Sequence, residues 1–177
     1  MIFLPDQSLQ ELVKNRFPQV QSIKFKKQFF HTINAVIFFS KPVIAISSVQ
    51  QPNGSVWYLL DAQYGLVGQT NTPSMLPRLE VPPSQWQFID HVYIASAGTK
   101  AVTLLRYLSV NYPQITGQLS LSFDLRVTIG HTLVIFSTDK DPAVSVATLQ
   151  LALRDPTIQK SPPAIIDLRF QNPVLSY

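Results

Sequence analysis

The segment Leu119–Ile129 constrains the fold most, because apolar and polar residues alternate along it without interruption. Every odd position is apolar and every even position is polar, which is the period of a β-strand with one buried face. Gly130 interrupts the pattern, and Thr132–Ser137 continues with residues typical of strands. The sequence therefore predicts one long strand over 119–129, paired with 132–137 in a β-hairpin.

Two predicted helices flank this hairpin. Thr99 is expected to cap the first, which ends at about residue 112 before Pro113, and Asp141-Pro142 is expected to start the second, which runs to about Arg154. Further strands are predicted over 88–94 and 165–170. We therefore expect residues 81–177 to form a curved antiparallel sheet with the helices 99–112 and 142–154 packed on one side.

The first 80 residues predict a smaller unit. A short helix ends before Phe17-Pro18, and strands are expected over 20–26, 32–40 and 56–60. Pro42 suits the first turn of a short helix through about Ser48. These patterns predict a small α+β module, so that the whole chain belongs to the α+β class.

Proline is frequent between these two parts. The chain has 14 prolines against 6 glycines, which favours short elements over a long helical bundle. Pro73, Pro77, Pro82 and Pro83 crowd into residues 71–85. Such a stretch is typical of a semi-rigid linker, and we expect the domain boundary there, with units at 1–80 and 81–177.

The composition excludes several classes of protein. Of 177 residues 46% are hydrophobic, which excludes a disordered chain, and the absence of cysteine excludes disulfides, thiolate metal sites and a cysteine nucleophile. No segment approaches the roughly 18 apolar residues of a membrane span, and residues 1–6 do not resemble a signal peptide.

The net charge of +4 suits an acidic partner or an anionic surface. It falls short of the dense basic stripe of a nucleic-acid binder. Phe25 alternates with Lys24 and Lys26, so its ring is expected to face inward and not to stack on bases. We therefore expect no nucleic-acid partner.

Residues able to carry chemistry are scattered. The histidines His31, His91 and His131 are isolated in sequence, which predicts no metal site. The segment 137–140 matches the Ser-x-x-Lys motif of penicillin-recognising acyl enzymes, but the companion motifs Ser-Asp-Asn and Lys-Thr-Gly are absent. We expect no catalytic residues, no cofactor and no small-molecule substrate. A cell-wall hydrolase or transpeptidase using Ser137 and Lys140 is one alternative.

The order of these signals resembles a known family. Phe17-Pro18-Gln19-Val20 and Lys41-Pro42-Val43-Ile44-Ala45 resemble the latter part of a POTRA domain, whose first strand and helix are missing, and Tyr58 to Gly65 resembles the hairpin that follows it. The closing segment Ile166-Asp167-Leu168-Arg169-Phe170-Gln171-Asn172 is similar to the final β-strand of the FtsQ/DivIB cell-division proteins.

The resemblance implies a non-catalytic divisome scaffold on the extracytoplasmic side of the bacterial plasma membrane, with a single-pass anchor upstream. It implies FtsB/DivIC-like and FtsL-like coiled-coil partners bound at the C-terminal edge strand, and other divisome proteins bound at the POTRA-like module. By position, the partner-contacting residues are Arg169, Phe170, Asn172 and Val174. A final strand of alternating character can itself accept an added strand, although Pro173 has no N–H to offer it. The alternative is a POTRA-type client-binding module of a secretion or outer-membrane assembly system.

Overall fold

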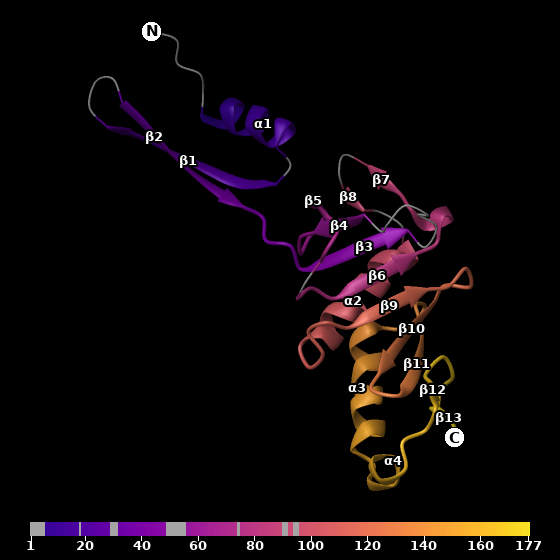
Figure 1. Cartoon of the computed structure of the whole chain (residues 1–177). Coiled ribbons are helices and arrows are strands. Elements are labelled where there is room, and N and C mark those ends of the chain that lie inside the picture. Colours follow the sequence, from indigo (N-terminus) through magenta and orange to yellow (C-terminus); the bar gives the residue numbers. More distant parts are fainter. Residues whose placement is uncertain are drawn as a thin grey trace.

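A mixed nine-stranded sheet organises most of the chain, in the strand order β13-β12-β11-β10-β9-β6-β3-β4-β5 (Figure 1). The computed structural model describes residues 6–17, 19–28, 32–48, 56–73, 75–89, 92–93 and 96–177. Its helices are α1 (Asp6–Arg16), the 3-10 helix η1 (Pro83–Gln85), α2 (Ser96–Ser109), α3 (Pro142–Arg154) and α4 (Pro156–Lys160).

The strands of the large sheet come from both halves of the chain. They are β3 (Ile44–Ser48), β4 (Trp57–Leu60), β5 (Leu66–Thr70), β6 (Arg78–Val81), β9 (Thr116–Leu119), β10 (Asp124–Ile129), β11 (Thr132–Ser137), β12 (Ile165–Asp167) and β13 (Val174–Ser176). The sheet is thus continuous across the boundary predicted at about residue 80. A small hairpin, β7 (Phe88–Ile89) and β8 (Val92–Tyr93), takes the place of the strand predicted over 88–94.

The N-terminal module consists of α1 and the antiparallel hairpin of β1 (Val20–Gln28) and β2 (Thr32–Phe39). It projects from the body of the molecule and forms a separate two-stranded sheet (Figure 1). Val20 and Ile23 are buried among the side chains of this module that the structure describes, and α1 packs on β1. The helix and the two strands predicted in this region are confirmed.

Helices α2 and α3 cover one face of the large sheet (Figure 1). The core lies between them and the strands, and it includes Leu105 from α2, Leu149 from α3 and Phe136 from β11. Gly117 on β9 allows the close approach of α2, since a Cβ there would lie 3.0 Å from Leu105 Cδ1. The α+β class, with a large sheet and packed helices, is confirmed.

Three strand pairs are parallel, namely β3–β6, β6–β9 and β11–β12, so the sheet is mixed and the expectation of an antiparallel sheet is corrected. The reason lies in the connections. The chain between β6 and β9 contains α2, and the chain between β11 and β12 contains α3 and α4. A crossover of this kind returns the chain in its original direction, which makes the strands parallel.

Two predictions for the middle of the chain are wrong. Residues 44–48 form strand β3 and not a helix, because Ile44–Ser47 are buried between β4 and β6 and pairing outweighs the helix-start signal of Pro42. Residues 71–85 are not simply a linker. They contain β6, an interior strand with Leu79 and Val81 fully buried.

The alternating segment 119–129 is also not one strand. β9 ends at Leu119 and β10 begins at Asp124, and a turn separates them. Ser120 Oγ accepts a hydrogen bond from Asp124 N at 3.0 Å, and Phe123 adopts a left-handed φ of 63°. Serine hydroxyls that bond the backbone two to four residues away favour turns, and here that tendency interrupts the strand.

The hairpin β10–β11 is confirmed, with Gly130 at φ 61° in its turn. Helix α3 is confirmed with its cap, because Asp141 Oδ1 accepts a hydrogen bond from Val144 N at 3.0 Å. Helix α2 begins at Ser96 and not after Thr99, which lies inside it. The turn predicted around Asn53-Gly54 lies outside the described residues.

Gly98 provides a test of how tightly α2 packs. A Cβ at this position would lie 2.0 Å from the hydroxyl oxygen of Tyr93, which is buried and donates a hydrogen bond to Gln85 O at 3.0 Å. We expect Gly98→Ala to lower the free energy of unfolding in urea by about 2 kcal/mol, because the buried ring must move. Gly68→Ala is the control, since no atom lies within 4 Å of its Cβ, and it should change stability by less than about 0.5 kcal/mol. Equal effects of the two substitutions would contradict this packing.

Candidate partner-binding edge

Strand β13 forms one edge of the large sheet. It pairs antiparallel with β12, with Val174 opposite Asp167 and Ser176 opposite Ile165, and no other described strand pairs with it. Leu175 packs against the core, whereas Val174 and Tyr177 are exposed. An edge strand of this kind offers backbone N–H and C=O groups to an incoming strand.

The strand predicted over 165–170 is shorter than expected, and it is not the edge. β12 ends at Asp167 and lies between β11 and β13, so its backbone is already paired on both sides. Residues 168–173 form a bend that leads into β13. Pro173 precedes the strand, so its missing N–H does not interrupt β13 itself.

A charged cluster holds the start of this bend. Arg169 Nη2 lies 2.6 Å from Asp167 Oδ2, Arg169 Nε donates to Asp167 Oδ1 at 3.0 Å, and Arg169 Nη1 lies 3.0 Å from Asp124 Oδ2. The Arg169 backbone N–H also donates to Asp167 Oδ1 at 3.0 Å. One guanidinium group thus links the last residue of β12 to the first residue of β10. The planar set of N–H donors in arginine suits this geometry.

The electrostatics of the cluster follow from this geometry. Hydrogen bonds from Arg169 lower the pKa of Asp167, although burial of the carboxylate opposes this effect. The same bonds raise the pKa of Arg169. Asp167 is therefore ionised, and the Arg169 guanidinium balances its buried negative charge.

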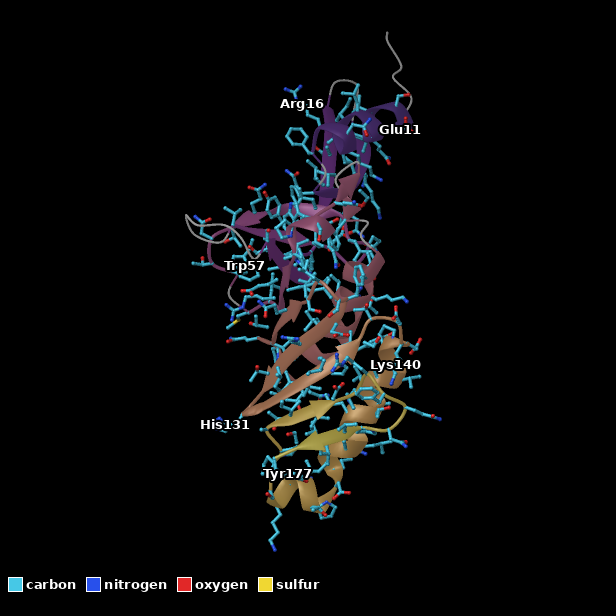
Figure 2. The ribbon with its side chains drawn as sticks, turned by 90° about the vertical axis from the view of Figure 1, so that its right-hand side faces the viewer. Glu11, Arg16, Trp57, His131, Lys140 and Tyr177 are labelled. Carbon is cyan, nitrogen blue, oxygen red and sulfur yellow. The ribbon has the colours of Figure 1, made fainter. Side chains whose placement is uncertain are left out.

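Lys140 fastens the same bend from another side. It follows β11 in the chain, and its Nζ donates to Leu168 O at 2.8 Å and to Phe170 O. Figure 2 labels Lys140 on the side of the molecule away from His131 in the β10–β11 turn. Two backbone carbonyls of the bend are therefore bound to one ammonium group, which fixes where the chain turns toward β13.

The four predicted contact residues lie in or next to this bend. Arg169 is bound within the cluster, and its guanidinium lies 5.8 Å from the ring centre of Phe170, whose side chain is 56% exposed. Asn172 is exposed in the bend, and Val174 begins β13 and is exposed. The structure thus brings Arg169 and Phe170 together and places Val174 on the edge, whereas Asn172 lies outside any strand.

Two residues of this region escaped the sequence reasoning. Asp124 was one polar position of an alternating pattern, and nothing in the pattern indicates its ion pair with a residue 45 positions away. For Lys140 the sequence indicates only the Ser-x-x-Lys motif. Its contacts are with carbonyl groups that are 28 and 30 residues away, so no local spacing could have revealed them.

The arrangement gives Ser137 and Lys140 no shared catalytic geometry. Ser137 is the last residue of β11 rather than part of a helix start, and its Oγ accepts a hydrogen bond from Asp139 N at 3.2 Å. The Lys140 ammonium is bound to the two carbonyls of the bend. An acyl-enzyme mechanism needs the amine beside the serine hydroxyl, and the structure favours a positioning role for Lys140 instead.

Other chemical groups remain apart. Among the described residues, no three histidine, cysteine, aspartate or glutamate side chains are grouped as metal ligands. His131 is exposed in the β10–β11 turn, whereas His31 and His91 lie outside the described residues. No described helix is long and apolar enough to cross a membrane.

The sequence matches no model of a known protein family, and it matches no curated protein. The functional proposal therefore depends on the geometry of the C-terminal edge and on the resemblance carried by the closing segment.

Removal of the Arg169 guanidinium should destabilise the fold in a pH-dependent way. We expect Arg169→Gln to lower the free energy of unfolding at pH 7 by about 1 kcal/mol, a modest value because the Arg169 side chain is 38% exposed. In the native chain the pKa of Asp167 is lowered, so its stabilising contribution is present above the unfolded value of about 3.9 and is lost as pH falls below it. The variant should therefore lose less stability than the native chain between pH 6 and pH 3.

Urea denaturation at pH 7, pH 6 and pH 3 measures both effects. Arg126→Gln is the control, because Arg126 is an exposed arginine on β10 that lies outside the cluster. A variant at Arg169 with the same stability and pH dependence as this control would show that the cluster does not stabilise the bend.

Proposed function

We propose that this chain is a non-catalytic scaffold of the FtsQ/DivIB type that binds a partner by strand addition to β13. The observation that carries the proposal is the free edge of β13, which follows a bend fixed by Arg169 and Lys140. Because the bend that leads into β13 is already held in place, little conformational entropy is lost when a strand is added to this edge. Such an edge suits a binding protein that recruits other proteins.

In this proposal the backbone of Val174–Ser176 pairs with an extended segment of the partner. Side chains beside the edge then supply selectivity, as in other cases of β-augmentation. Phe170 is the best anchor, because the residue is 56% exposed and its ring lies beside the Arg169 guanidinium. Aromatic anchors at such positions often carry much of the binding energy.

The proposed partners and cellular location of the chain rest on the resemblance of the closing segment. The proposed partners are FtsB/DivIC-like and FtsL-like coiled-coil membrane proteins, and the proposed location is the extracytoplasmic side of the bacterial plasma membrane. Other divisome proteins would bind at the POTRA-like module. In this role the chain would help to recruit and hold the septal cell-wall synthesis machinery.

Phe170→Arg tests the proposed edge directly. We expect calorimetric titration with the extracytoplasmic part of an FtsB/DivIC-like protein to show saturable binding by the native chain, weakened at least tenfold in the variant. The reason is the loss of an exposed aromatic anchor in the bend that leads into the edge strand. Tyr107→Arg is the matched control, since Tyr107 is an aromatic residue on α2 with a side chain 48% exposed.

The control variant should bind as the native chain does. Binding that Phe170→Arg leaves unchanged would place the interface elsewhere and would favour a client-binding module. No binding by a folded native chain would overturn the scaffold proposal.

Lys140→Met tests whether the fixed bend matters for binding. Methionine keeps much of the side-chain length but cannot donate to Leu168 O and Phe170 O. We expect the affinity for the same partner to fall about three- to tenfold, because the bend must then be ordered on binding. Lys160→Met, at an exposed lysine that ends α4, is the control. An unchanged affinity would show that Lys140 does not position the edge.

A further inference from the structure

Strand β2 has exposed apolar side chains on both of its faces. The exposed apolar side chains are Ile33, Val36, Ile37, Phe38 and Phe39. A strand of this composition is normally covered on both sides. Its hairpin instead projects from the body of the molecule (Figure 1). Something outside the described residues is therefore needed to shield this surface from water.

The pairing register distinguishes the two faces. Ile37 lies opposite Ile23, which is buried in the module that includes α1. The other face combines basic and apolar side chains, with Lys24 opposite Val36 and with Phe38 beside them. Lys24 Nζ lies 5.4 Å from the centre of the Phe38 ring, so the charge and the aromatic surface are adjacent.

The charge of the molecule is concentrated in the same module. Residues 6–41 contain six lysines and arginines, against Asp6 and Glu11, a net charge of +4. The remainder of the chain contains eight basic and eight acidic residues, so residues 6–41, which are the N-terminal module and the two residues after it, carry the whole net charge of the protein. The charge favours an anionic occupant for the face that carries Lys24 and Lys26, because a second copy of the chain would bring like charge to like.

We propose that the face formed by Lys24, Lys26, Val36 and Phe38 docks on an anionic lipid bilayer. Lysine ammonium groups would lie among the headgroup phosphates, while their alkyl chains and the Phe38 ring would enter the boundary with the acyl chains. A projecting hairpin reaches a flat surface more readily than a recessed site does. This surface is distinct from the β13 edge and does not depend on it.

Flotation with lipid vesicles tests the proposal on the whole chain. We expect binding to vesicles containing 30% phosphatidylglycerol in phosphatidylcholine, at least tenfold weaker binding to pure phosphatidylcholine, and loss of most binding in 0.5 M NaCl. Lys24→Gln with Lys26→Gln should weaken binding at least tenfold, since each lysine near an anionic surface contributes roughly fivefold. Phe38→Ser should weaken it severalfold.

Matched control variants distinguish the effect of this face from a general loss of positive charge or of apolar surface. Lys100→Gln with Lys160→Gln removes two exposed lysines from α2 and α4, and Ile37→Ser removes a similarly exposed apolar residue from the opposite face of β2. Both should bind vesicles within about twofold of the native chain. Phe170→Arg should also bind vesicles normally, so failure of the scaffold proposal and failure of this one are distinguishable.

Three results would overturn the proposal. The first is the absence of binding to phosphatidylglycerol vesicles by folded protein, and the second is an equal loss in the control variants. The third is a dimer in sedimentation that Phe38→Ser dissociates, which would assign the face to a second copy of the chain.

Discussion

The packing of α2 and α3 on one face of the sheet is the contact on which the rest of the structure depends. It buries the large apolar side chains of the core and requires close approach at Gly117, where a Cβ would lie 3.0 Å from Cδ1 of Leu105 on α2. The crossovers through these helices make β9 parallel to β6 and β12 parallel to β11. The position of β12 in turn leaves β13 at the edge of the sheet.

The two proposed binding surfaces differ in how they are built. The C-terminal edge is attached to the core through β12, and its approach is fixed by charged hydrogen bonds from Arg169 and Lys140. The basic face of the hairpin belongs to a module with little buried surface of its own. A fixed edge favours selective pairing with one segment, whereas a basic and apolar surface favours a partner without defined sequence.

Elements with a strong local signal could be predicted from the sequence. Helix α3 has its Asp141 cap, and Gly130 marks the β10–β11 turn by its positive φ. The structure shows that Phe170 and Val174 are exposed, and their role in binding a partner stays a prediction. The turn within 119–129 was missed, because alternation continues through Leu121 and Phe123 although both side chains are exposed there. Strand β3 was missed because its pairing with β4 and β6 outweighs a local helix signal.

The sequence by itself determined the α+β class, the concentration of positive charge before residue 42 and the absence of cysteine chemistry. These are properties of composition and of local period, which need no knowledge of distant contacts. Only the tertiary structure decided the order and direction of the strands, the edge position of β13 and the ion pair between Asp124 and Arg169. The reason is physical: hydrogen bonds between strands and between distant side chains depend on which segments the buried core brings together.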